Sequence, residues 1–271
     1  MHKKFSAFNM ASLIMGFAFL YIPILLLIIF SFNESRLVTV WSRFSTKWYG
    51  ELLQNEAILN AAMVTLKVAL MSSTVATILG TMAGFSMSRF GIFRGRTLFN
   101  GMIYAPLVMP EVVTGLSLLL MFVAISLDRG VLTITLAHIT FSMCYVAVVV
   151  QSRLTSFDRS IEEAAMDLGC PPHKTFFLIT LPIIMPAVAS GWLLSFTMSL
   201  DDLVIASFTS GPGATTLPMK IYSQVRLGVT PEINAVSTIL IGIVAIGVVI
   251  TSIVHKRNMA HKERDQRLAD S

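Results

Sequence analysis

The chain has 271 residues, of which 55% are hydrophobic and 13% are charged, and its mean hydropathy is +0.75. A soluble domain carries roughly 25% charged residues, so this chain has about half the charge that a water-exposed surface needs. That deficit excludes an ordinary soluble enzyme. The formal net charge of +5 has the sign of a nucleic-acid-binding protein, but the Lys and Arg residues lie between or beyond long apolar segments. We therefore expect them to orient the chain in a lipid bilayer, and we expect no nucleic-acid partner.

Six apolar segments are long enough to cross the hydrocarbon core, which takes about 20 helical residues. They cover residues 11–32, 61–87, 98–125, 131–151, 183–208 and 235–254. Prolines within them, such as Pro23 and Pro110, are tolerable because neighbouring helices can satisfy the freed carbonyl groups. If the N-terminus is inside, thirteen Lys and Arg residues lie in the cytoplasm, six lie outside, and Lys67 lies within a segment. The sequence therefore predicts an all-α polytopic membrane protein with six transmembrane helices and both termini in the cytoplasm.

The connections between these segments define the domain organisation. Segments 33–60 and 209–234 are expected outside, and the long connection 152–182 is expected in the cytoplasm. The charged tail 255–271 is expected to be a solvated helix end. We therefore predict a single membrane domain over residues 1–271, with no soluble enzyme attached.

Residues that could carry catalysis or hold a cofactor are scarce. The sequence contains no G-x-x-x-x-G-K-[ST] phosphate loop, so ATP and Mg²⁺ would have to be bound by a separate subunit. His138 lies alone in the fourth segment, and Cys144 and Cys170 have no metal-ligand spacing. We expect no catalytic residue, no metal site and no cofactor in this chain.

The long cytoplasmic connection carries the most specific pattern. Ser160 followed three residues later by Glu163 is typical of a capping box at a helix start. Gly169 is placed to end that helix in a left-handed conformation. A second helix can begin at Pro171 or Pro172, because proline suits the first turn, and would lead into the fifth segment.

Two interpretations of this two-helix loop remain open on physical grounds. It is a packed connector, or it offers a short amphipathic helix to the groove of a partner. In the second case Ala164 and Ala165 allow close approach, and the acids remain in water. These acids are Glu162, Glu163 and Asp167.

One motif in the loop resembles the EAA loop of binding-protein-dependent ABC importers. The motif reads Glu163-Ala164-Ala165, three residues, Gly169, nine residues, Ile179, one residue and Leu181-Pro182. The resemblance covers roughly residues 60–255 and implies the type I importer permease fold. In that family the loop is the coupling helix, which docks into the nucleotide-binding subunit. The resemblance therefore implies coupling roles for Glu162, Glu163, Ala164, Ala165, Asp167 and Gly169.

The same resemblance implies a set of partners. These are a homologous second permease, two ATP-binding subunits and a periplasmic solute-binding protein. It also implies a multi-pass location in the bacterial inner membrane. The outer segments 33–60 and 209–234 would then meet the solute-binding protein. Trp48, Tyr49 and Leu52, with Leu53, form a short amphipathic face there, for which lying flat at the membrane interface is an alternative.

Three acids lie inside apolar segments, namely Glu111, Asp201 and Asp202. A carboxylate in the bilayer interior costs several kcal/mol, so each is a functional candidate. Glu111 and Asp201 lie about 20–27 Å along their helices and hence at similar depths. Lys67 or a partner subunit could pair with one acid, but not readily with all three. Adjacent Asp201 and Asp202 point about 100° apart, so one can face a substrate pathway while the other caps or bridges. The pattern predicts a cation site.

Four stretches resemble the polyamine branch of the importer family and sharpen the predicted substrate. They are residues 45–53, 105–111, 199–208 and 211–218. Position 111 holds glutamate where relatives are expected to hold aspartate, so the charge is kept while the reach differs by one methylene. The resemblance implies putrescine or a related polyamine as the substrate.

A diamine has an ammonium at each end of an alkyl chain, so its pathway needs carboxylates and an apolar or aromatic surface. Tyr104, Tyr145 and Trp192 lie in the third, fourth and fifth segments and could contribute cation–π contacts. Packing or interfacial roles are the alternative for each of them.

The predicted function is that of a permease subunit of an ATP-driven polyamine importer working by alternating access. The alternative is a stand-alone secondary transporter or cation channel that uses the intramembrane carboxylates as a relay. That alternative leaves the spacing of the cytoplasmic motif unexplained.

Overall fold

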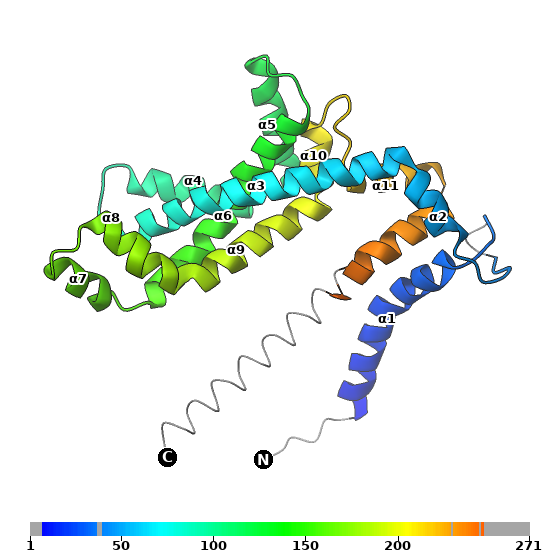
Figure 1. Ribbon diagram of the computed structural model, residues 1–271, viewed down its shortest axis with the longest axis horizontal. Coiled ribbons are helices and arrows are strands. Elements are labelled where there is room, and N and C mark those ends of the chain that lie inside the picture. The colour runs from blue at the N-terminus through cyan, green and yellow to red at the C-terminus, as the bar shows by residue number, and fades with distance from the viewer. Residues whose placement is uncertain (1–6, 37–39, 229, 244, 247–271) are drawn as a thin grey trace. The chain divides into compact units, whose positions relative to one another are not determined.

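The computed structural model describes residues 7–36, 40–228, 230–243 and 245–246 (Figure 1). These residues are mostly helical, and the β pairing among them is one isolated antiparallel bridge between Asn33 and Phe44. The chain divides into two compact units, Met1–Glu56 with Ser223–Ser271 and Ala57–Tyr222.

The first unit contains α1 (Ala7–Ser31), α2 (Lys47–Gln54) and an apolar helix over Pro231–Ile243. Helix α1 is apolar on all sides and long enough to cross a bilayer, which confirms the first predicted segment. It contains Pro23 without a break. The end of the sixth predicted segment and the tail 255–271 lie outside the described residues.

Helix α2 packs against its own chain. Trp48 is buried, and its indole Nε1 donates a hydrogen bond of 2.6 Å to the carbonyl oxygen of Asn33. Leu52 is also buried, and the Tyr49 hydroxyl lies 2.7 Å from Ser31 Oγ. Of the four residues of the predicted amphipathic face, Leu53 is the most exposed, at 70%. The face is therefore largely used within the unit.

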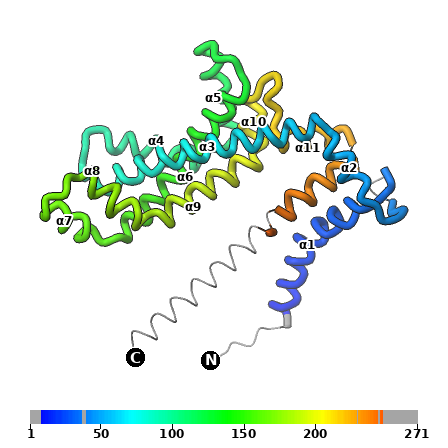
Figure 2. The backbone as a smooth tube through the Cα atoms, viewed as in Figure 1, coloured from blue at the N-terminus to red at the C-terminus, as the bar shows by residue number. Residues whose placement is uncertain are grey.

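In the second unit three long helices run side by side, as Figures 1 and 2 show. They are α3 (Glu56–Arg89), α6 (Val131–Ser156) and α9 (Leu181–Asp201). Helix α6 is the most buried of the three, because it packs against both α3 and α9. These helices confirm the apolar segments predicted around residues 61–87 and 131–151.

Glycine lets the backbones of α3 and α6 approach closely. A Cβ atom at Gly80 would lie 2.6 Å from the carbonyl oxygen of Met143, and one at Gly84 would lie 2.6 Å from that of Ala147. The spacing of four residues places both glycines on one face of α3. Small residues at this spacing are typical of tightly packed helices in membranes.

The segment predicted over residues 98–125 is not one continuous helix. The segment forms α4 (Arg96–Val108) and α5 (Glu111–Ala124), with a bend of 117° between them. Met109 is extended with ψ of 140°, because the ring of Pro110 disfavours the helical conformation of the residue before it. Pro110, which we expected the helix to tolerate, instead separates two helices.

The fifth predicted segment is also divided. Helix α9 ends at Asp201, and α10 (Val204–Thr209) starts after a two-residue break. At its other end α9 is continuous with α8 (Pro172–Thr175) and with the π-helical turn η1 (Phe176–Thr180). The helix therefore begins in the predicted cytoplasmic loop, before the apolar segment does.

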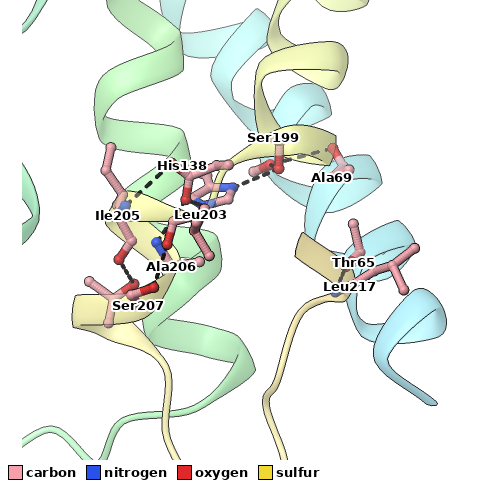
Figure 3. Close-up of polar contacts among 12 residues, drawn as sticks. Thr65, Ala69, His138, Ser199, Leu203, Ile205, Ala206, Ser207 and Leu217 are labelled. Atoms are coloured by element: carbon pink, nitrogen blue, oxygen red, sulfur yellow. Dashed lines mark hydrogen bonds and ion pairs between the residues drawn. The ribbon is translucent and has the colours of Figure 1, made fainter. Parts of the chain in front are cut away.

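Two further helices complete the second unit. Helix α7 (Ser160–Asp167) follows α6, and α11 (Leu217–Leu227) begins in this unit. The backbone N–H of Leu217 donates a hydrogen bond of 2.7 Å to Thr65 Oγ1, which attaches the start of α11 to α3 (Figure 3).

By length and composition the described residues contain four helices able to cross a membrane, or five if α4 and α5 form one bent span.

Candidate functional site

A pocket of about 300 Å³ lies where α9 ends and α10 begins. We call it the acid pocket. It is lined by Glu111, Phe141, Met198, Asp201, Asp202, Leu203 and Val204. The structure thus brings together all three acids that the sequence places inside apolar segments. Both helix breaks contribute to this arrangement, since Glu111 starts α5 after the bend and Asp201 ends α9.

Both carboxylate oxygens of Asp202 interact with groups of the same chain. Its Oδ1 accepts a hydrogen bond of 3.3 Å from the backbone N–H of Ile205, and its Oδ2 accepts one of 2.7 Å from that of Ala206. The carboxylate therefore caps the start of α10. Oδ2 also lies 3.1 Å from His138 Nε2, and the Asp202 side chain is only 5% exposed. This geometry matches the expectation that one of the two adjacent acids caps or bridges.

His138, which the sequence places in the fourth segment without metal-ligand spacing, is the centre of a buried polar network. Its Nδ1 lies 2.6 Å from Ser199 Oγ, as Figure 3 shows, and Ser72 Oγ donates a hydrogen bond of 3.2 Å to the same oxygen. The network joins α3, α6, α9 and the start of α10. A buried imidazole needs hydrogen-bond partners. The adjacent acids Asp201 and Asp202 in the next apolar segment were the sequence signal that could have predicted this network.

Glu111 and Asp201 differ from Asp202 because both are exposed to the pocket. Among the described residues, no Lys, Arg or His forms an ion pair with either carboxylate. Lys67, which the sequence offered as a partner, is exposed and forms no ion pair with an acid in the described part of the chain. Two carboxylates without a counter-ion can accept charge-assisted hydrogen bonds from a cationic ligand.

The three aromatic residues predicted for the pathway do not line the acid pocket. Tyr104 donates a hydrogen bond to a side chain of α6 and Trp192 donates one to a side chain of α3, and neither lines the acid pocket. Tyr145 packs edge-on against Phe141, with ring centroids 5.6 Å apart. Phe141 is the aromatic residue that lines the pocket, and its role was not predicted from the sequence.

At the other end of α9, the turn after α7 has the predicted form. Gly169 has a φ of +87°, a left-handed conformation. Its N–H donates to the carbonyl of Met166 over 2.9 Å, and the N–H of Cys170 donates to that of Ala165 over 3.0 Å. This pair of bonds is the Schellman motif. The second helix begins at Pro172, as predicted.

The predicted capping box at the start of α7 is wrong. Asp158 Oδ1 accepts a hydrogen bond of 3.0 Å from the backbone N–H of Ser160, and this bond lowers the pKa of Asp158. Glu163 instead pairs with Arg159, with 3.0 Å between Oε1 and Nε. The carboxylate of Asp158 is charged and therefore a stronger acceptor than a serine hydroxyl.

Glu162 does not remain in water, contrary to expectation. It is 4% exposed, and its Oε2 lies 2.6 Å from Arg89 Nε. Its Oε1 accepts a hydrogen bond of 2.6 Å from Thr180 Oγ1. We call Arg89, Glu162 and Thr180 the loop cluster. The other acids of the loop, Glu163 and Asp167, are exposed.

With this geometry established, comparison with known proteins assigns the chain to a family. Residues 76–258 match the family described as binding-protein-dependent transport system inner membrane component. The chain belongs to this family. It is thus a membrane component of a transport system, and the predicted family is confirmed.

Two curated relatives of this transport component extend over most of its length. The putrescine transport system permease protein PotI of Escherichia coli (strain K12) is 60% identical over 247 residues, which cover 89% of this chain and 88% of the relative. The spermidine/putrescine transport system permease protein PotC of the same strain is 42% identical over 238 residues, covering 88% and 90%.

Solved transporters share the fold of this transport component. A bacterial ABC transporter involved in the import of the acidic polysaccharide alginate has a TM-score of 0.69 at 16% identity, covering 93% of this chain and 98% of that chain. The MetNI methionine ABC transporter in an inward-facing conformation has a TM-score of 0.61 at 13% identity, covering 72% and 92%. At such identities the similarity shows the fold alone. Solved ABC transporters thus share the fold of this chain, in agreement with the importer permease fold predicted from the sequence.

Proposed function

We propose that this chain is the transmembrane permease subunit of an ATP-driven importer that moves putrescine or a related polyamine across the bacterial inner membrane. The observation that carries the proposal is the acid pocket, in which Glu111 and Asp201 have no counter-ion among the described residues. An ammonium group needs such acceptors. The two relatives, a putrescine and a spermidine/putrescine permease, support the same substrate class.

In this proposal the chain crosses the membrane six times with both termini in the cytoplasm. Four long helices and the bent α4–α5 pair account for five crossings. The sixth begins with the apolar helix over Pro231–Ile243. The excess of Lys and Arg on one side of these segments supports the orientation.

Helix α7 is the proposed docking element for one of two separate ATP-binding subunits, which bind ATP and Mg²⁺. Ile161 is 48% exposed and Leu168 is 90% exposed, although both are apolar. Ala164 is exposed beside the acids Glu163 and Asp167. A packed connector would bury these apolar side chains, whereas a helix that enters a partner's groove presents them.

The proposed mechanism is alternating access, shared with a homologous second permease. Closure of the ATP-binding subunits moves α7, and the helices open outward to receive substrate from a periplasmic solute-binding protein. ATP hydrolysis then restores the inward-facing state. The acid pocket offers carboxylates to an ammonium group of the substrate, and Phe141 and Met198 offer apolar surface to its alkyl chain.

Reconstitution tests this function. The chain is purified with its partner permease and ATP-binding subunits, placed in proteoliposomes, and supplied with solute-binding protein and radiolabelled putrescine. We expect uptake that requires ATP, and co-purification of the ATP-binding subunits with the chain. Uptake by the chain alone, driven by an ion gradient, would instead support the secondary transporter.

A further inference from the structure

The loop cluster contains a buried ion pair whose role the proposed function does not specify. The side chains of Arg89 and Glu162 are 10% and 6% exposed, and Nε and Oε2 lie 2.6 Å apart. Removing one partner of such a pair leaves an uncompensated charge in a buried site. Thr180 supplies a further hydrogen bond to the carboxylate, so both Glu162 oxygens are engaged.

This cluster joins four elements. Arg89 is the last residue of α3, and its Nη1 donates a hydrogen bond of 3.1 Å to the carbonyl oxygen of Leu154, near the end of α6. Its guanidinium lies 5.9 Å from the centroid of the Phe157 ring, just after α6. Glu162 belongs to α7, and Thr180 is the last residue of η1, directly before α9.

Apolar packing around the cluster is incomplete. A pocket of about 620 Å³ lies among the end of α3, α7, α8 and η1. Arg89, Glu162 and Thr180 all line it, together with apolar residues such as Phe85 and Phe176. Phe85 of α3 packs edge-on against Phe176 of η1, with ring centroids 4.7 Å apart, whereas α7 is connected to α3 by the ion pair of Glu162 with Arg89.

The cluster and the acid pocket lie at opposite ends of one helix. Thr180 directly precedes α9, and Asp201 ends it, after 21 residues or a length of about 30 Å. Helix α6 likewise runs from the pocket residue Phe141 to Leu154 beside Arg89. A displacement of α7 that the cluster transmits therefore reaches two helices that line the pocket.

We propose that Arg89, Glu162 and Thr180 are positioning residues that transmit the movement of α7 to the helices of the acid pocket. The inference rests on the proposed function, because α7 must be the element that the ATP-binding subunits move. Without the cluster, ATP hydrolysis continues but no longer changes the conformation of the acid pocket. Loss of coupling, rather than loss of hydrolysis or of assembly, is the distinguishing result.

The first test is Glu162→Gln in the full complex in proteoliposomes, with putrescine uptake and ATP hydrolysis measured on the same preparation. Glutamine keeps the shape of the side chain but removes its charge. We expect ATP hydrolysis to continue but no longer to be stimulated by the solute-binding protein, and uptake per ATP hydrolysed to fall about 10-fold, within the range of a typical coupling between two sites. An unchanged ratio, or an equal fall in uptake and hydrolysis, would overturn the proposal.

Thr180 provides a test that leaves the ion pair in place. Thr180→Val removes the hydroxyl with little change in volume, and Thr180→Ser retains it. We expect a lower ratio of uptake to hydrolysis for the valine variant and a normal ratio for the serine variant. Arg94→Gln is the matched control, because Arg94 is an exposed arginine near the end of α3 and outside the cluster. Equal ratios in the valine and serine variants would contradict the proposal.

A separate readout distinguishes failure of this inference from failure of the proposed function. Stimulation of ATP hydrolysis by the solute-binding protein reports coupling without measuring transport. A wild-type complex that shows stimulation but imports no polyamine would refute the proposed substrate, and the cluster is then judged on stimulation alone. A Glu162→Gln complex with normal stimulation would refute the role of the cluster.

Discussion

The two ends of α9 use carboxylates in opposite ways. At the end that carries Asp201, two acids line a pocket without a counter-ion among the described residues. At the end that follows Thr180, Glu162 is buried with both oxygens engaged by its own chain. Asp202 lies beside Glu111 and Asp201 but, like Glu162, is hydrogen-bonded within its own chain. An acid in apolar surroundings is therefore a binding candidate only after its partners have been counted.

The largest expected effect comes from removing the charges of both Glu111 and Asp201. Glu111→Gln combined with Asp201→Asn deletes two acceptors of charge-assisted hydrogen bonds. Each such bond contributes about 1.5–3 kcal/mol, so two contribute at least about 3 kcal/mol and we expect putrescine uptake to fall at least about 100-fold. Uptake by proteoliposomes at subsaturating putrescine measures this, and ATP hydrolysis and assembly should remain intact.

Two matched variants sharpen the contrast within the pocket. Asp128→Asn removes an exposed acid outside the pocket and should leave uptake unchanged. Asp202→Asn keeps an oxygen acceptor for the cap of α10, so its uptake should fall less than that of Asp201→Asn. Equal losses of uptake in Asp201→Asn and Asp202→Asn would contradict the distinction between a carboxylate without a counter-ion and one that is hydrogen-bonded within the chain.

A smaller effect is expected at the other end, from Gly169→Ala. A left-handed conformation costs a residue with a Cβ atom about 1–2 kcal/mol. We expect the turn after α7 to shift and the yield of co-purified ATP-binding subunits to fall about 10-fold. Gly169→Asn is the control, because asparagine tolerates this conformation better. If alanine and asparagine give equal yields, backbone strain at Gly169 does not control docking.

The smallest effect is a pH dependence at the start of α7. The hydrogen bond from Ser160 lowers the pKa of Asp158 in the folded protein below its ordinary value of 3.8. The cap is therefore present at pH values above 3.8 and is lost as the pH falls through the lower folded pKa. Hydrogen exchange of the 158–167 peptide, corrected for intrinsic rates, should show constant protection from pH 8 to 5. A decline of protection within that interval would exclude Asp158 as the cap.

The sequence predicts helix positions well here, because hydropathy and turn residues are local signals. Gly169 and Pro172 bound their helices as expected. The capping partner was misassigned, because Asp158 and Ser160 are both near the helix start and only the geometry decides which oxygen is used. The break at Pro110 escaped hydropathy, since the residues on both sides of it are apolar.

The partners of buried groups could not be predicted from the sequence. His138 and Ser199 are far apart in the chain, as are Arg89 and Glu162. Such pairs depend on how α3, α6 and α9 pack, and that packing depends in turn on close contacts such as the one at Gly80. The acid pocket was anticipated because charge in an apolar segment is itself conspicuous, whereas Phe141 was one apolar residue among many.

The π-helical turn η1 has a consequence for the orientation of α9. A π turn inserts one residue into a helix without adding a turn, and one residue corresponds to about 100° of rotation. The faces before and after Phe176–Thr180 are therefore out of phase by that angle. A helical wheel drawn through the whole stretch from Pro172 to Asp201 would turn Asp201 away from Glu111. The register of the helix before η1 and the direction of the Asp201 carboxylate are thus set separately, although one continuous backbone carries both.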